Sequence, residues 1–212
     1  YSFFGYNMRN PMLADKRVRQ AFTYALNRQE MLDSFFGGQG TIISGPFAPG
    51  SWAYNLDVAP LPFDPTRAAA LLKEAGFAPG ADGIMQKDGK KLSLTLKVPI
   101  EKESEAVKRV VLAFKNYLKN VGADIKVEFK EWQAWKEDVF FEHDFDIIFA
   151  VWVFDDSADI SSLFHSGEIG AWKNNFGGYS NPEVDGLNNE SKLTLDHEKR
   201  RTINRKLHTI LA

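Results

Sequence analysis

Apolar residues in this chain switch between the spacing of a helix and the strict alternation of a strand. In residues 16–26 they recur on one helical face, at Val18, Ala21, Phe22 and Ala25. Asp15 precedes this segment and suits the N-cap of a helix. Helical spacing returns in residues 28–36, 65–75 and 104–121, each followed directly by glycine. The first 121 residues therefore predict four amphipathic helices.

Alternating residues predict the strands. Leu92, Leu94, Leu96 and Val98 are separated by Ser93, Thr95 and Lys97, so one face of a strand over residues 90–99 is predicted to be buried. Asp88-Gly89 precedes it and favours a tight type I′ turn after residues 84–87. Residues 1–8 are aromatic-rich, and residues 125–129 alternate in the same way. Both segments are predicted to be strands.

The chain is organised around a run of seven apolar residues, Ile147 to Val153. Its length and β-branched content predict a strand that is buried on both faces. From Leu92 onward the predicted order is strand, helix, strand, helix (residues 131–141), strand. This order favours an α/β fold with a mixed, partly parallel sheet flanked by helices. Two further helices are predicted after Asn181.

Composition narrows the function. The chain has 212 residues, 44% of them hydrophobic, and its net charge of −2 offers no basic surface for nucleic acid. No cysteine is present, which excludes disulfides and thiolate metal sites, and no apolar run is long enough to span a bilayer. The chain begins without Met in a predicted strand and ends in a helical pattern. We therefore expect residues 1–212 to be one α/β lobe excised from a longer protein.

Candidate chemistry follows the organising strand, at Asp155, Asp156 and Asp159. Ligands of open α/β sheets bind beyond the carboxyl ends of the strands. These carboxylates could be a glycosidase acid/base pair, hold a divalent cation, pair with a cationic ligand group, or cap a helix that begins near Ile160. The chain has no serine-nucleophile elbow and no phosphate-binding loop. Its four histidines lack ligand spacing and are expected at the surface or in caps. No cofactor, metal site or catalytic residue is therefore predicted.

Tryptophans form the second candidate set. Trp132 and Trp135 lie three residues apart in a predicted helix, so at least one of them should belong to the core. Trp152 ends the organising strand and Trp172 lies in a later loop. Aromatic walls beside a carboxylate suit a site for peptides or sugars, whereas core packing is the alternative for Trp132 and Trp152.

Several stretches together resemble one family, the extracellular solute-binding proteins of family 5, the oligopeptide and dipeptide type that serves ABC importers. They are RVRQAFTYALNRQEML (17–32), GPFAPG (45–50), FDPTRAAALLKEAGF (63–77), WVFDD (152–156) and GGYSNPEVDGL (177–187). The resemblance implies the second lobe of a two-lobed periplasmic binding protein, with the first lobe absent. The resemblance implies that the protein is not an enzyme. The intact receptor would bind a peptide or related small solute in a cleft and deliver it to the permease.

The resemblance also implies a location and a site. The receptor would be periplasmic or attached to the cell surface, with membrane contact only through the permease or a lipid anchor. In peptide-binding members, a Trp is followed three residues later by an Asp that pairs with the ligand ammonium. Trp152 and Asp155 have this spacing, whereas the family's second Asp spacing falls on Asp156 and Asp159, so Asp155 and Asp156 both remain candidates.

The other ligand contacts are less constrained by the resemblance. Trp135 matches a helix position that can face the cleft, and Trp172 is taken as a further aromatic contact. The arginines that can meet a peptide carboxylate are not matched, since Glu142 and Phe149 stand nearby. Because related members bind nickel complexes, oligosaccharides, haem or opines, the ligand class stays open. The competing hypothesis is a glycosidase-like hydrolase that uses Asp155 and Asp156.

Overall fold

A four-stranded mixed sheet forms the centre of the protein. The computed structural model describes residues 1–100, 105–153 and 157–212. The strand order is β1 (Ser2–Tyr6), β7 (Ile147–Val151), β5 (Ser93–Ile100) and β6 (Asp124–Glu131). β5 is parallel to both β6 and β7, whereas β1 is antiparallel to β7, with Phe4 opposite Phe149. The predicted mixed, partly parallel sheet is confirmed.

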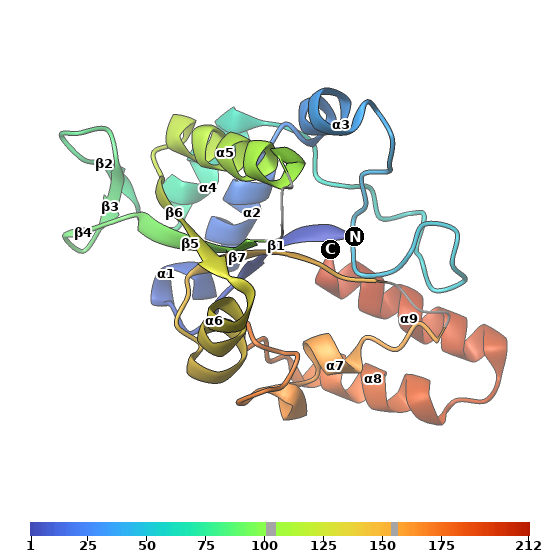
Figure 1. The fold of residues 1–212 in the computed structure, drawn as a ribbon. Coiled ribbons are helices and arrows are strands. Elements are labelled where there is room, and N and C mark those ends of the chain that lie inside the picture. The colour runs from blue at the N-terminus through green and yellow to red at the C-terminus, as the bar shows by residue number, and fades with distance from the viewer. Residues whose placement is uncertain (101–104, 154–156) are drawn as a thin grey trace.

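Three helices cover one face of this sheet: α2 (Lys16–Ala25), α4 (Pro65–Glu74) and α5 (Glu105–Asn120) (Figure 1). Their buried side chains share one core cluster with the strands, including Phe22, Leu72, Phe114 and Leu96. α1 (Pro11–Ala14) precedes α2, and α3 (Arg28–Phe36) follows it. The predicted N-cap Asp15 is confirmed, and Asn27 and Asp64 cap α3 and α4 in the same way, since each accepts a hydrogen bond from a backbone N–H of the helix it precedes.

A shorter helical segment covers the opposite face. α6 (Trp132–Lys136) runs directly into a π-helical turn, η1 (Glu137–Glu142). Trp135 and Val139 from this segment pack with Phe145, Ile148 and Phe176 in a separate hydrophobic cluster. Since Ile147 and Phe149 belong to the cluster on the other face, β7 is buried on both faces over these three residues. Further along, the prediction of burial is wrong: Val151 is 62% exposed and Val153 is 82% exposed.

A small three-stranded sheet projects from the domain, formed by β2 (Ala78–Pro79), β3 (Met85–Lys87) and β4 (Lys90–Lys91) (Figure 1). Asp88 and Gly89 have φ values of 51° and 73°, as the predicted type I′ turn requires. The single strand predicted over residues 90–99 is instead divided at Leu92. The Leu92 N–H bonds to the Met85 carbonyl, whereas its own carbonyl accepts from the Asp124 N–H, so the chain changes sheets there.

The last third of the chain adds α7 (Ser161–Phe164), a 3-10 turn η2 (Ser166–Glu168), and the helix pair α8 (Pro182–Leu193) and α9 (His197–Leu211). A third cluster joins this pair to the proline-rich loop of residues 44–63, through Phe47, Tyr54, Val184, Leu187, Ile203 and Leu207. The loop is therefore a packed element of the fold. Within residues 1–100, 105–153 and 157–212, no helix combines the length and apolar character that crossing a membrane requires.

His208 on α9 corrects an expectation, because histidines were predicted to lie at the surface or in caps. Its side chain is fully buried. The Asn55 N–H donates to Nδ1 at 2.8 Å, so the ring proton belongs on Nε2, which lies 2.9 Å from the Ser44 hydroxyl. Burial lowers the pKa of His208. The neutral imidazole therefore fastens the 44–63 loop to α9.

Candidate ligand-binding site

An apolar hollow of about 500 Å³ opens at the carboxyl ends of the parallel strands. We call it the aromatic pocket. Its aromatic lining residues are Phe3, Phe129, Trp132, Trp135, Phe140, Phe149, Trp152 and Phe176, and Pro99, Ile100, Val107, Lys108, Ala150 and Val151 complete it. Lys108 is the only charged residue among the described residues of this lining. The location is where open α/β sheets bind ligands.

Trp132 and Trp135 form one wall of the aromatic pocket. Their rings are stacked, with centroids 5.3 Å apart and planes inclined by 12°. Trp135 is 3% exposed, so the prediction that at least one of the pair belongs to the core is confirmed, whereas Trp132 is 42% exposed. The Trp135 indole N–H donates to the Lys97 carbonyl at 3.2 Å. The inner ring is thus fixed to β5, and the outer ring remains accessible.

Lys97 lies behind this wall and corrects the predicted polar face of its strand. The residue is 5% exposed, because α6 and η1 cover that face. Its ammonium donates to Asp138 at 2.7 Å and to Asp144 at 2.8 Å, and Lys130 also pairs with Asp138. Burial alone would lower the pKa of Lys97, but these hydrogen bonds outweigh it and raise the pKa above its ordinary value.

The pKa of Asp138 is shifted in the opposite direction, below its ordinary value. Burial alone would raise its pKa, but hydrogen bonds from Lys130 and Lys97 hold the pKa below the ordinary value. Both partners are therefore charged at neutral pH. This ion cluster joins η1 to β5 and β6, and hence holds the segment that carries Trp135 and Phe140 against the sheet.

Trp152 lies in the aromatic pocket, as its predicted ligand role requires. Its backbone N–H donates to the Tyr1 carbonyl at 2.8 Å, and its own carbonyl accepts from the Tyr1 backbone nitrogen at 2.5 Å. Trp172 is not brought to the pocket lining. It is 57% exposed, its φ is 61°, and its ring lies 5.8 Å from that of Phe141. The structure thus unites Trp135 and Trp152 but places Trp172 elsewhere.

Five lining aromatics escaped sequence reasoning: Phe3, Phe129, Phe140, Phe149 and Phe176. The Phe140 ring lies edge-on to the rings of Trp135 and Phe176, with centroid distances of 6.1 Å and 5.4 Å. Phe3 comes from β1, opposite Ala150 of β7. These residues come from distant segments, and no local pattern distinguishes them from ordinary core aromatics.

The structure describes one of the three candidate carboxylates, that of Asp159. Asp155 and Asp156 lie outside the described residues, so their roles stay predictions. The Asp159 carboxylate accepts from the Ser161 N–H at 2.9 Å and from the Ser161 hydroxyl at 2.6 Å, so Asp159 caps the turn that leads into α7, whereas Ile160 occupies the N-cap position of the helix. Its pKa is lowered, because these hydrogen bonds outweigh burial, which alone would raise it. In the described part of the chain, no cluster of three or more His, Asp or Glu side chains could hold a metal ion.

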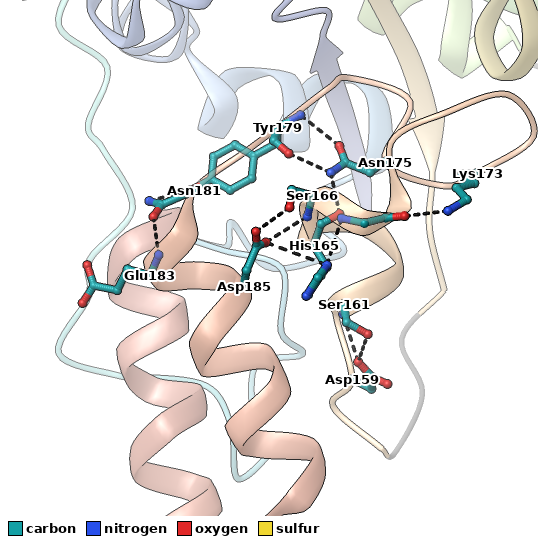
Figure 2. A network of polar contacts seen from close by, with 11 residues as sticks. Asp159, Ser161, His165, Ser166, Lys173, Asn175, Tyr179, Asn181, Glu183 and Asp185 are labelled. Carbon is teal, nitrogen blue, oxygen red and sulfur yellow. Dashed lines mark hydrogen bonds and ion pairs between the residues drawn. The ribbon is translucent and has the colours of Figure 1, made fainter.

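A polar network orders the segment that delivers Phe176 to the pocket (Figure 2). Asn175 donates to the carbonyls of His165 and Tyr179 at 3.0 and 2.8 Å, and it accepts from the Tyr179 N–H at 2.9 Å. Asp185 on α8 accepts from the N–H and hydroxyl of Ser166 at 2.8 and 2.5 Å. The segment therefore has a defined conformation without regular secondary structure.

Comparison with known proteins identifies the family. The profile described as bacterial extracellular solute-binding proteins, family 5 Middle, matches residues 1–173. The chain belongs to this family. Family 5 relatives include the oligopeptide-binding protein AppA of Bacillus subtilis, which is 32% identical over 203 residues. That alignment covers 94% of this chain and 37% of the relative.

Solved structures of family 5 proteins have the same fold. AppA of B. subtilis in complex with a nonapeptide matches with a TM-score of 0.92 and 30% identity, covering 99% of this chain and 42% of that one. The oligopeptide-binding protein of Thermus thermophilus with a pentapeptide matches with a TM-score of 0.84 and 25% identity, covering 99% and 39%. The chain thus spans less than half the length of these relatives. The predicted family and α/β fold class are confirmed.

Proposed function

We propose that residues 1–212 are one lobe of a two-lobed receptor, the substrate-binding component of an ABC importer. The intact receptor closes around a peptide or related small solute and presents it to the permease. The observation that carries this proposal is the aromatic pocket at the carboxyl ends of β5, β6 and β7, in a chain of family 5. Relatives named as oligopeptide-binding and dipeptide-binding proteins favour a peptide.

The proposed location follows from the family. Its description is extracellular, and delivery to a permease requires a receptor outside the membrane, in the periplasm or attached to the cell surface. Binding and release suffice for this role, so we propose no catalytic step and no cofactor. A thermal-shift screen of the intact receptor should show stabilisation by peptides. Turnover of chromogenic glycosides would instead support the hydrolase hypothesis.

We further propose that Asp155 or Asp156 pairs with the ligand ammonium. Asp155 and Asp156 lie three and four residues after Trp152 in the chain, and Trp152 lines the pocket. A charge-assisted hydrogen bond in a closed, dry cleft is stronger than the same pair on a surface. Asp159 is excluded from this role because its carboxylate already caps the α7 segment through Ser161.

Calorimetry on the intact receptor tests the carboxylate. Asp155→Asn or Asp156→Asn should weaken binding at least tenfold, a loss of about 1.4 kcal/mol. Acetylating the peptide amino group should cause a comparable loss in the wild-type receptor. Asp159→Asn is the matched control, since it removes a charge from the same segment but keeps an acceptor for Ser161. Unchanged affinity in both test variants would refute the assignment.

A further inference from the structure

The opening of the aromatic pocket exposes large apolar side chains that a folded protein would normally bury. Ile100 is 54% exposed, Val151 62%, Trp132 42% and Phe129 40%. All four line the same hollow. Clustered exposed apolar side chains of this kind mark binding surfaces, whereas scattered ones need no explanation.

We propose that the aromatic pocket is a subsite that selects a large apolar side chain of the ligand, preferably an aromatic one. This inference rests on the proposed function, because it assumes a peptide or similar solute in the cleft. The volume of about 500 Å³ lies within the range of small-molecule sites and leaves room for an aromatic ring and its flanking backbone. Trp132 is 42% exposed, so part of its ring is accessible to an aromatic side chain of the ligand.

The charges of the pocket favour a neutral side chain. Lys108 is the only charged group among the described lining residues, and its ammonium already pairs with Glu105 at 2.7 Å. The nearby Lys136 ammonium lies 5.6 Å from the centroid of the Trp132 ring. A charged ligand side chain would lose water among aromatic rings without gaining a dedicated partner. Such a loss is unfavourable.

Hydrogen bonds, ring contacts and an ion pair fix the side chains that form the wall of the pocket. Trp135 is tied to the Lys97 carbonyl, Phe140 lies edge-on between Trp135 and Phe176, and the Lys97–Asp138 ion pair holds the helical segment to the sheet. A pre-formed pocket saves the ligand the entropy cost of ordering it. Selectivity for side-chain size is therefore expected.

Peptide affinities of the intact receptor test this subsite. Tripeptides that differ only by Phe, Ala or Lys at one position, scanned over all three positions, are titrated by calorimetry. At one position the Phe peptide should bind about 10- to 100-fold more tightly than the Ala peptide, and the Lys peptide should also be weaker than Phe. Trp132→Ala should remove most of this preference, so that the Phe and Ala peptides bind with similar affinity. Trp172→Ala is the matched control, since it removes an exposed tryptophan outside the pocket lining, and should preserve the preference.

The possible failures are distinguishable. Peptide binding without any preference for Phe, or a preference that Trp132→Ala leaves intact, would overturn the subsite while the proposed function stands. If no peptide binds, N-acetyl-phenylalanine amide is used as a direct probe of the pocket. Its binding is monitored by tryptophan fluorescence and compared with that of N-acetyl-alanine amide. Selective quenching or enhancement by the phenylalanine probe would keep the subsite and refute the peptide function. No response to either probe would overturn both. If another part of the receptor covers the pocket, peptides should bind without a preference for Phe and Trp132→Ala should lower the melting temperature, which would also overturn the subsite.

Discussion

The indole N–H of Trp135 donates to the main-chain carbonyl of Lys97, and the Lys97 ammonium pairs with Asp138, three residues after Trp135. One residue of β5 therefore holds the α6–η1 segment through both its backbone and its side chain. π-Helical turns such as η1 are frequent at functional sites. Here the turn places Phe140 in the lining of the aromatic pocket.

Trp135→Phe should lower the free energy of unfolding by about 1 kcal/mol, since it removes the hydrogen bond to Lys97 while keeping an aromatic ring. Trp135→Ala should cost about 3–5 kcal/mol, because it also leaves a cavity. Urea denaturation measures both changes. Trp172→Phe, at a 57% exposed site, is the control and should change stability by less than about 0.5 kcal/mol. Equal effects at the two positions would contradict the anchoring role.

Lys97→Met should destabilise the protein by about 3 kcal/mol, because it leaves the largely buried Asp138 carboxylate with Lys130 as its one remaining counter-charge among the described residues. Adding Asp138→Leu to this variant should recover part of the loss, and the double-mutant cycle measures the coupling. Lys91→Met breaks an exposed pair with Asp82, whose side chains are 58% and 46% exposed, and should cost less than about 1 kcal/mol. A Lys97→Met loss no larger than this control would show that the buried cluster is not structural.

Stability should fall in mildly acidic solution because of His208. Burial lowers its pKa in the folded state, so the unfolded chain binds the proton more readily. The stabilisation is complete above the unfolded pKa of about 6.5 and is lost as the pH falls toward the folded pKa. Protonation of Nδ1 also removes the acceptor for the Asn55 N–H. Urea denaturation at pH 7.5 and 5.5 should therefore show a lower midpoint at the acidic pH.

His208→Gln identifies the source of this pH dependence. Glutamine keeps a neutral donor and acceptor at every pH, so the difference between the two pH values should shrink, although the new side chain itself costs some stability. His197→Gln, at a side chain that is 63% exposed, is the control and should retain the wild-type difference. Retention of the full difference in His208→Gln would rule out this residue as its cause.

Asp159→Ala should cost about 1 kcal/mol of stability, the usual effect of losing a cap acceptor. Asp159→Asn should cost less, since its carbonyl oxygen can still accept from the Ser161 N–H. Thermal unfolding measures both variants. Ligand affinity of the intact receptor should stay within twofold of wild type in each, and a tenfold loss would show that Asp159 itself contacts the ligand.

The sequence by itself determined the features that depend on near neighbours. Asp15, Asn27 and Asp64 cap helices through backbone N–H groups two or three residues away, and Asp88-Gly89 turns a hairpin, so composition within a few positions was sufficient. The order of helices and strands followed from periodicity, and with it the partly parallel sheet. Trp135 and Trp152 were each predicted to contact the ligand; both line one pocket, and their ligand role stays a prediction.

Only the tertiary structure decided what covers each face and which distant side chains meet. Alternation correctly placed Lys97 on the face opposite Leu96, but the burial of that face depends on α6, whose docking position has no local signature. The same reason explains the buried His208, held by a loop more than 150 residues away in the chain. Phe3, Phe140 and Phe176 converge with Trp135 and Trp152 because strand pairing and helix packing bring separate segments together. A ligand pocket is made from such contacts, and residue spacing along the chain does not contain them.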